Sequence, residues 1–475
     1  MKIKSYILAV ILLLFGVKGA FSEISMPVSS GPSNGIPAIE PFNKTDRVLI
    51  FVPHPDDETI GCAGVIQNAL KSGSDLRVVY LTNGDHNQFA FIVYEKRLVF
   101  KRSAFIYLGE LRKKEAIRAM KIMGLDESNM VFLGYPDFGT FAVFARYWEH
   151  TKPYMSWLTR ISSVPYKGDM SYEAVYTGES ILSDLKRVLL EYKPTKIFVS
   201  HPADTNPDHK AFFLFLEVAL ADLEKYIHKP KVYSYLIHSS GWPLPRQYHP
   251  ELTLEPPRQF LNSSVQWEKI DLTAEELNRK YMAILAYKSQ TESSAFYLLS
   301  FARRNELFGN YPQARLIKES QENSGEQLLG VSILDDLMRT EELDEPIEKD
   351  ALILRGKGSV RYELKDSCLV VSISKPRESL DRFNAMVYLF GYSQNTPFSH
   401  MPKICVIIRK KTFQIFDTNR LLDSKGVSMD FNDNEVVLKL PLKILGDPDF
   451  VLASVRVQTG PLQSDASAFR KIILK

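Results

Sequence analysis

Residues 48–58 read VLIFVPHPDDE and decide both the fold and the chemistry expected of this chain. The five apolar residues at 48–52 are typical of a strand that is buried on both faces of a parallel sheet. One imidazole and three carboxylates follow directly: His54, Asp56, Asp57 and Glu58. In a doubly wound α/β sheet, reactive groups lie just beyond the carboxyl ends of the strands. The stretch therefore predicts a buried strand that leads into a polar site.

A second polar cluster follows another short apolar run. Residues 197–200, IFVS, have the composition of a buried strand, and residues 201–209, HPADTNPDH, come directly after it. Neutral imidazole and carboxylate together form a ligand set that suits Zn²⁺. Because two such strands in one sheet bring their carboxyl ends to the same edge, the two clusters can converge. The sequence predicts a metal site built from both.

Strand and helix patterns alternate through residues 46–315. We expect strands at 47–52, 76–82, 130–133, 196–200 and 231–237, and helices at 58–71, 111–124, 180–193, 209–227 and 273–288. The last helix begins with a candidate capping box, Thr273 followed by Glu276. This alternation predicts an α/β domain with a Rossmann-like, mostly parallel sheet and helices on both faces.

The pattern changes in the last part of the chain. Short strand-like runs broken by Gly, Pro, Asn and Asp fill residues 349–475, which predicts a C-terminal antiparallel β-sandwich. Residues 316–348 are polar and acidic, and we interpret them as a partly helical linker. The expected folded units are therefore residues 46–315 and 349–475.

The N-terminal residues predict export. Lys2 and Lys4 precede an apolar run at 6–17, and small residues stand just before Glu23, which is the pattern of a cleavable signal peptide at residues 1–22. The run is shorter than the roughly 20 residues that a membrane span needs, although an uncleaved anchor is the alternative. Residues 23–45, which contain many Ser, Pro and Gly, would be a linker. We expect a periplasmic or secreted protein without a transmembrane anchor after cleavage.

The overall composition is that of a globular protein. The chain has 475 residues, 45% hydrophobic and 24% charged, and a formal net charge of +3. A nucleic-acid partner is not expected, since such proteins concentrate positive charge in a basic patch. Three cysteines in an exported chain do not make a disulfide scaffold. Cys368 and Cys405 either pair or remain two buried free thiols.

These motifs together resemble the PIG-L/LmbE-like family of zinc-dependent N-deacetylases, which remove acetyl groups from N-acetylglucosamine-type sugars. The resemblance is carried by HPDDE at 54–58 and by the D-x-x-x-D-H pattern at 204–209. It is supported by RKKE at 112–115, LGYPD at 133–137 and YKSQ at 287–290, and it spans roughly residues 46–310. It implies hydrolysis of an N-acetyl group on an amino sugar in a glycan or glycoconjugate.

The resemblance also implies roles for particular residues. His54, Asp57 and His209 are the expected ligands of one Zn²⁺, with a fourth position left for water, whose pKa the ion lowers towards about 7. Asp56 is the expected general base, because it is adjacent to a ligand and faces the water. Asp208 is expected to orient an imidazole through its other nitrogen.

One position departs from the family pattern. Asn206 stands where many members have a histidine that polarises the acyl oxygen or protonates the departing group. An amide can donate a hydrogen bond to an oxyanion but cannot transfer a proton. We therefore expect Asn206 to keep half of that role, while His201 or His238 supplies the other half.

Further residues are expected to bind substrate. The resemblance places Arg112 in the site, although a surface ion pair with Glu115 is the alternative. The other three expected substrate-binding residues are Asp137, His201 and His238. Residues 139–177 are rich in aromatics, and four of these either stack on sugar rings or pack the core of this segment: Tyr147, Trp148, Tyr154 and Trp157.

Two other classes of protein remain open at this stage. Two histidines and one carboxylate also form the facial triad of Fe(II) oxygenases. A degenerate metal domain that presents the sandwich to polysaccharide would be a non-catalytic carbohydrate-binding protein. The carboxylate of Asp56 beside the ligands favours hydrolysis, and the complete ligand set argues against degeneration.

Overall fold

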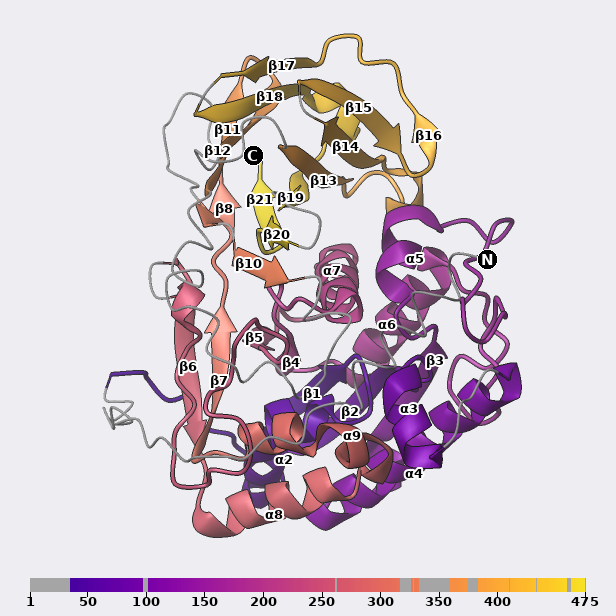
Figure 1. Cartoon of the computed structure of the whole chain (residues 1–475), viewed down its shortest axis with the longest axis vertical. Coiled ribbons are helices and arrows are strands. Elements are labelled where there is room, and N and C mark those ends of the chain that lie inside the picture. The colour runs from indigo at the N-terminus through magenta and orange to yellow at the C-terminus, as the bar shows by residue number, and fades with distance from the viewer. Residues whose placement is uncertain are drawn as a thin grey trace, which may run out of the picture. The chain divides into compact units, whose positions relative to one another are not determined.

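A seven-stranded sheet organises the first part of the chain in this computed structural model (Figure 1). Its strand order is β3-β2-β1-β4-β5-β7-β6. The first five strands are parallel, and β7 joins β5 and β6 antiparallel. The strands are β1 (Arg47–Val52), β2 (Asp75–Thr82), β3 (Met130–Tyr135), β4 (Lys196–Ser200), β5 (Lys231–Tyr235), β6 (Gln266–Asp271) and β7 (Asn305–Asn310). The predicted α/β fold with a mostly parallel sheet is confirmed.

The structure describes most of the chain after the N-terminal segment. The described residues are 35–96, 101–260, 263–316, 326–327, 329–332, 359–374, 383–409, 411–432, 434–458 and 463–474. The predicted signal peptide at 1–22 lies outside them. Among the described residues, no helix combines the length and the apolar character that crossing a membrane requires.

Helices cover both faces of the seven-stranded sheet, as Figure 1 shows. One face carries α2 (Asp57–Ser72), α4 (Arg102–Met123), α8 (Ala274–Leu285) and α9 (Lys288–Leu298), and the short α3 (Gln88–Glu95) packs on α9. The other face carries α5 (Thr140–Arg146), α6 (Gly178–Tyr192) and α7 (Pro207–Asp222). Helix α8 begins with the predicted capping box of Thr273 and Glu276. The sequence did not predict α3, α5, α9, β6 or β7.

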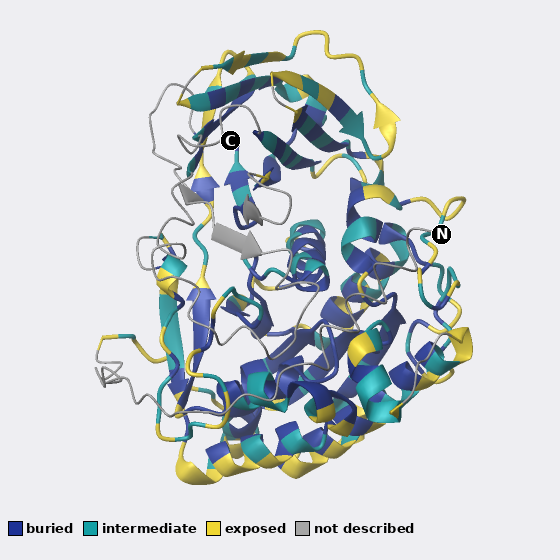
Figure 2. Ribbon diagram, in the orientation of Figure 1, coloured by how far each residue is buried: buried dark blue, intermediate teal, exposed yellow. Residues whose placement is uncertain are grey.

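The apolar run of β1 is buried on both faces, as predicted. Val48, Ile50 and Val52 lie in the hydrophobic cluster under α2 and α4, whereas Leu49 and Phe51 lie in the cluster under α6 and α7. Successive side chains of a strand point to opposite faces, so a strand between two layers of helices must be apolar throughout. Figure 2 shows the sheet as a buried layer, with exposed residues on the outer faces of the helices.

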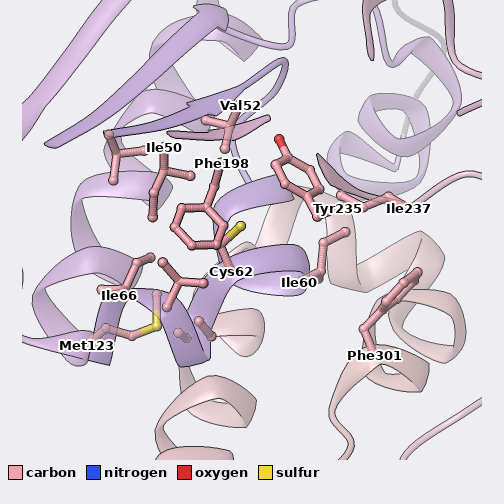
Figure 3. Close-up of a cluster of buried hydrophobic side chains, with 14 of the residues drawn as sticks. Ile50, Val52, Ile60, Cys62, Ile66, Met123, Phe198, Tyr235, Ile237 and Phe301 are labelled. Atoms are coloured by element: carbon pink, nitrogen blue, oxygen red, sulfur yellow. The ribbon is translucent and has the colours of Figure 1, made fainter. Parts of the chain in front are cut away.

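Helix α2 approaches the sheet closely because it carries a glycine at the contact. Figure 3 shows Phe198 of β4 and Tyr235 of β5 beside Cys62 of α2. A Cβ on the neighbouring Gly61 would lie 2.8 Å from Cδ2 of Tyr235, closer than side chains pack. The glycine therefore allows α2 to lie against β5, which fixes the first turn of α2 near the carboxyl ends of the strands.

The last part of the chain forms two further sheets, of nine and five strands. Among the described residues, the pairings in these sheets are antiparallel except that β8 (Ala314–Arg315) pairs parallel with β21 (Arg470–Ile473). The other strands are β11 (Ser359–Lys365), β12 (Cys368–Ser374), β13 (Asn384–Tyr392), β14 (Lys403–Arg409), β15 (Thr412–Asp417), β16 (Arg420–Leu421), β17 (Ser428–Phe431), β18 (Glu435–Pro441), β19 (Phe450–Gln458) and β20 (Gln463–Ala466). Inward-facing residues of both sheets share one hydrophobic cluster. The predicted antiparallel β region is confirmed.

Of the predicted linker at 316–348, the structure describes residues 316, 326–327 and 329–332, and the rest of the predicted linker lies outside the described residues. The described part contains strands β9 (Glu326–Gln327) and β10 (Leu329–Ser332). Strand β9 pairs with β11, and β10 pairs with β20. Pairing with the edges of the two sheets satisfies backbone hydrogen-bonding groups that the local sequence alone would leave to water.

The described residues from Ile36 onwards form one compact unit. The hydrophobic cluster under α5 and α7 continues into the β region, where the ring of Phe144 lies 5.3 Å from that of Phe390. Trp148, one of the aromatic residues predicted either to bind sugar or to pack, is buried against Phe398 at 4.9 Å. All three cysteines are free, so Cys368 and Cys405 are not paired.

Candidate metal centre

The candidate site lies where the strand order of the seven-stranded sheet reverses. Strands β2 and β3 lie on one side of β1, and β4 and β5 lie on the other. Ile50 of β1 pairs in register with Phe198 of β4, so the loops after these two strands begin side by side. Such a switch point opens a crevice at the carboxyl ends of the strands. The two polar clusters of the sequence follow β1 and β4, and they meet there.

The three predicted ligands come together at this edge of the sheet. The Nδ1 atom of His54 lies 3.2 Å from Oδ2 of Asp57, and Nε2 of His209 lies 3.1 Å from the same oxygen. One ligand atom from each residue lies within 4.8 Å of the other two, and all three residues are buried. The backbone N–H of His54 donates to Asp57 at 2.9 Å, which holds the strand end against the first turn of α2. The geometry suits one small cation.

Two neighbouring groups of acidic and imidazole side chains also lie close enough to hold a cation: Asp204 with His209 and His238, and His54 with Asp137 and Asp208. Their carboxylates are largely occupied by the protein itself. Asp208 accepts hydrogen bonds from the backbone N–H groups of Phe138, at 2.5 Å, and Thr140, at 3.0 Å. Asp204 accepts from three backbone N–H groups, those of Asn206, Ile237 and His238.

Both ring nitrogens of His209 are buried and make no hydrogen bond among the described residues. Nε2 lies 3.1 Å from Oδ2 of Asp57, and Nδ1 lies 3.1 Å from Oδ2 of Asp204. A buried polar atom without a hydrogen bond is unfavourable unless another group satisfies it. A divalent cation between His54, Asp57 and His209 would satisfy Nε2, and two imidazoles with one carboxylate suit Zn²⁺. The residues present therefore fit the metal.

The carboxylates around the two histidines also favour a cation at this site. Burial lowers the pKa of His209, but Asp204 and Asp57 more than offset this effect and raise it to about 9. Burial also lowers the pKa of His54, yet Asp137 and its other carboxylate neighbours raise it well above the usual range. The carboxylates thus stabilise positive charge at the two imidazoles, whether a proton or a cation supplies it. Metal binding would compete with protons.

Asp56 occupies a strained and firmly held position next to the ligands. Its backbone has φ 123°, which non-glycine residues rarely adopt, and such strain is concentrated at functional sites. Nη2 of Arg112 donates to Oδ2 of Asp56 at 3.1 Å and to the carbonyl of Pro55 at 2.6 Å, and Nη1 donates to the carbonyl of Gly84 at 3.0 Å. Arg112 is buried and orients Asp56, in contrast to a surface ion pair with Glu115.

Asn206 and Asp208 begin helix α7 beside the ligands. Oδ1 of Asn206 accepts from the backbone N–H of Asp208 at 2.9 Å and caps the helix. Oδ2 of Asp208 lies 3.2 Å from Nε2 of His54, and Oδ1 of Asp137 lies at the same distance from this nitrogen. Asp208 and Asp137 thus contact His54 on the side opposite Asp57. The orienting role of Asp208 stays a prediction, and its contact is with the ring nitrogen of His54 that does not face Asp57.

His201 and His238, the two alternatives for replacing the family histidine, lie in different surroundings. The ring of His238 lies 4.5 Å from that of His209, and its Nδ1 lies 3.0 Å from Oδ1 of Asp204. His201 instead accepts from the backbone N–H of Ala203 and stacks on Trp267 at 5.9 Å. Burial lowers the pKa of His201 to about 3, so it stays neutral. His238 reaches the site and His201 does not.

Sequence reasoning assigned no role to two residues that the structure places at the site. Asp204 contacts both His209, at 3.1 Å from Nδ1, and His238. Its position in the D-x-x-x-D-H pattern was the signal that could have found it. Tyr287, in the YKSQ motif, donates to Glu58, the carboxylate that follows Asp57. Burial raises the pKa of Glu58 to about 8.

The fold and the site define a Rossmann-like α/β domain with a candidate metal centre at its switch point. Comparison with known families adds the particular family: residues 49–220 match the PIG-L family, GlcNAc-PI de-N-acetylase. The chain therefore carries a PIG-L family domain at these residues. The three candidate ligands lie within it.

Individual proteins match over shorter stretches. The chain is 36% identical over 87 residues to diacetylchitobiose deacetylase of Thermococcus kodakarensis, which is 18% of this chain and 31% of that protein. It is 29% identical over 117 residues to 1D-myo-inositol 2-acetamido-2-deoxy-alpha-D-glucopyranoside deacetylase of Mycobacterium sp. (strain KMS), 25% of this chain and 36% of that protein. The chain thus spans about a third of the length of these curated relatives.

Among solved structures, the chain is similar to N,N'-diacetylchitobiose deacetylase from Pyrococcus horikoshii. The TM-score is 0.31 and the sequence identity 18%, over 51% of this chain and 70% of that chain.

Proposed function

We propose that this protein is a zinc-dependent deacetylase that hydrolyses the N-acetyl group of an N-acetylglucosamine-type amino sugar. The observation that carries the proposal is the cluster of His54, Asp57 and His209 with the strained carboxylate of Asp56 beside it. The description of the matching family and the names of the two curated relatives support the type of reaction and the class of substrate. The N-terminal pattern at residues 1–22 supports action outside the cytoplasm.

The proposed roles follow from the position of each side chain. A Zn²⁺ ion held by the three ligands would lower the pKa of water and polarise an acyl carbonyl. Asp56 takes a proton from the attacking water, and Arg112 holds its carboxylate in place with a charge-assisted hydrogen bond. Asp208 and Asp137 fix the orientation of His54.

The departing amine needs a proton, and the acyl oxygen needs a hydrogen-bond donor. His238 lies next to His209, with 4.5 Å between the ring centroids, and its Nδ1 lies 3.0 Å from Oδ1 of Asp204, so its imidazole is the candidate to give the amine a proton. The amide of Asn206 is held at the start of α7, where its NH₂ group is the candidate donor to the acyl oxygen. His238 would thus supply the proton and Asn206 the hydrogen bond, two tasks that the resemblance assigns to one family histidine.

The test combines acetate release with metal analysis on the purified chain. We expect acetate from N-acetylglucosamine or its oligomers, and about one zinc per chain. Asp56→Asn should retain zinc and lose roughly 10²- to 10⁴-fold in turnover, the usual contribution of proton transfer. Asp57→Ala should lose both zinc and activity. His249→Ala, which changes a histidine outside the site paired with Glu251, is the control and should lose neither.

The same measurements separate the alternatives. An Fe(II) oxygenase would contain iron and consume oxygen without releasing acetate. A carbohydrate-binding protein would bind the sugars without turnover. Normal turnover by Asp56→Asn at full metal occupancy would remove Asp56 as the base.

A further inference from the structure

Three aromatic side chains gather beside the candidate metal centre without forming part of it. The ring of His86 stacks on that of Phe138, with centroids 5.4 Å apart and planes at 22°. The centroid of the Trp157 ring lies 6.2 Å from that of His86, with planes at 30°. The three residues come from the loops after β2 and β3 and from the segment between α5 and α6. We call His86, Phe138 and Trp157 the aromatic platform.

The backbone ties the platform directly to the site. The N–H of His86 donates to Oδ2 of Asp137 at 2.7 Å, and the other oxygen of Asp137 contacts His54. The N–H of Phe138 donates to Oδ2 of Asp208. The two carboxylates that contact the ligand His54 therefore also hold the backbone of two platform residues. The aromatic platform is therefore connected to His54 through Asp137 and Asp208.

The platform rings remain open to solvent. Phe138 is 49% exposed and Trp157 is 62% exposed, whereas Trp148 in the same region is buried. Phe138 has φ 60°, a conformation that bulky residues rarely adopt. The strained backbone of Phe138 holds a ring that is half exposed, so burial of the ring does not offset the cost of the strain. Backbone strain of this kind is concentrated at functional sites. The turn of Trp157 is fixed by backbone hydrogen bonds between Ser156 and Ile161 and between Arg160 and Ser156, both 2.9 Å.

The chemistry of the surroundings decides what the platform binds. Aromatic rings have a negative face, which attracts the polarised C–H groups on the face of a pyranose ring. The carboxylates of Asp137 and Asp208, which accept from the backbone N–H groups of His86 and Phe138, place negative charge beside the rings and disfavour an anionic ligand such as an acidic lipid or nucleic acid. A neutral sugar, or the cationic amino sugar formed when an acetyl group is removed, fits both the rings and the charges.

We propose that the aromatic platform is an accessory subsite that binds a pyranose next to the sugar undergoing deacetylation, so that the substrate is an oligosaccharide rather than a single sugar. This inference rests on the proposed function. The subsite contributes stacking energy that a monosaccharide cannot use, and its effect appears mainly in KM.

The kinetic test compares N-acetylglucosamine with triacetylchitotriose as substrates. The wild-type protein should have the higher kcat/KM for the trimer. Trp157→Ala should lower the trimer-to-monomer ratio of kcat/KM about tenfold, the effect of roughly 1.4 kcal/mol of lost stacking, mostly through KM. Trp157→Phe, which keeps a ring, should restore most of the ratio. Phe138→Leu, which keeps an apolar side chain without a ring, should lower it.

The control is Tyr226→Ala, which removes a 71% exposed aromatic ring in the turn after the C-terminal end of helix α7 and should leave the ratio unchanged. A ratio that Trp157→Ala and Phe138→Leu leave unchanged, while acetate is still released, would overturn the subsite and keep the proposed function.

A binding measurement separates failure of the subsite from failure of the reaction. Triacetylchitotriose should change the tryptophan fluorescence of the wild-type chain, and the change should be lost in Trp157→Phe. If no sugar releases acetate but this change is observed, the subsite holds and the deacetylase proposal fails. If neither acetate release nor the fluorescence change occurs, the subsite is refuted together with the reaction.

Discussion

At the scale of single residues, the site depends on side chains that perform two tasks. Asn206 caps helix α7 with its oxygen, and its NH₂ group is the candidate donor to the acyl oxygen. Asp208 binds the backbone of Phe138 and Thr140 and also contacts His54. Because each such residue joins structure and chemistry, alanine variants alone cannot separate the two roles, and variants that keep one role are more informative.

Asn206→Asp is such a variant. An aspartate caps a helix as well as asparagine does but lacks an amide donor. We expect normal thermal stability and a turnover 10²- to 10³-fold lower, the effect of losing about 2.7 to 4 kcal/mol of oxyanion stabilisation. Asn206→Ala should show the same loss of turnover and also lose about 1 kcal/mol of stability with the cap. If both variants turn over normally, Asn206 is only a helix cap.

Asp204→Asn tests the carboxylate that His209 and His238 share. The amide keeps the size of the side chain, but its NH₂ group cannot accept from the backbone N–H groups that Asp204 now binds. We expect zinc affinity, measured by competition with a chelator, to fall about 10- to 100-fold, as is usual when a group that orients a metal-binding histidine is lost. Asp222→Asn, a change at a carboxylate that pairs with Lys186, is the control and should bind zinc normally.

At the scale of elements, the position of α2 against β5 brings Asp57 to the site. Gly61→Ala should destabilise the protein by about 1 to 3 kcal/mol, because the added methyl group meets the ring of Tyr235. The higher helix propensity of alanine, worth up to about 1 kcal/mol, offsets only part of this cost. Chemical denaturation measures the change. A variant as stable as the wild type would show that α2 can move away from β5 without cost.

At the scale of the whole molecule, the α/β and β parts share buried contacts. The Nζ atom of Lys403 in β14 lies 4.7 Å from the ring of Trp148 and 4.0 Å from that of Phe398. It donates to the carbonyls of Phe398 and Met401, at 2.5 and 2.7 Å. Burial lowers the pKa of this lysine to about 7, which the nearby Asp417 only partly offsets.

This lysine gives a pH dependence with a definite sign. Between pH 7 and about 10 the unfolded chain binds a proton at Lys403 that the folded chain has released, so the contribution of this group to stability rises with pH. Lys403→Met removes that dependence. The free energy of unfolding of the variant minus that of the wild type should fall as pH rises, by at most about 1.4 kcal/mol per unit. Denaturation at pH 7 and pH 9 measures it, and an equal difference at both values would contradict it.

Much of the fold could be predicted from local patterns. The run at 48–52, the helix after it and the capping box of Thr273 are decided by the order of apolar and polar residues, because burial on one or two faces imposes a period on the sequence. Strands β6 and β7 and helices α3, α5 and α9 were missed. They are short or weakly periodic, and contacts with distant parts of the chain stabilise them.

The sequence by itself determined the class of fold and the two polar clusters, since His54, Asp57 and His209 follow buried strands whose ends must share an edge. Only the tertiary structure decided which neighbours complete the site. It brought His238 to His209 and placed His201 among aromatic rings. It turned Arg112 towards Asp56 and gathered the rings of the aromatic platform from three loops. The physical reason is that spacing along a strand or helix fixes only local geometry, whereas contacts between loops depend on how the whole sheet and its helices pack.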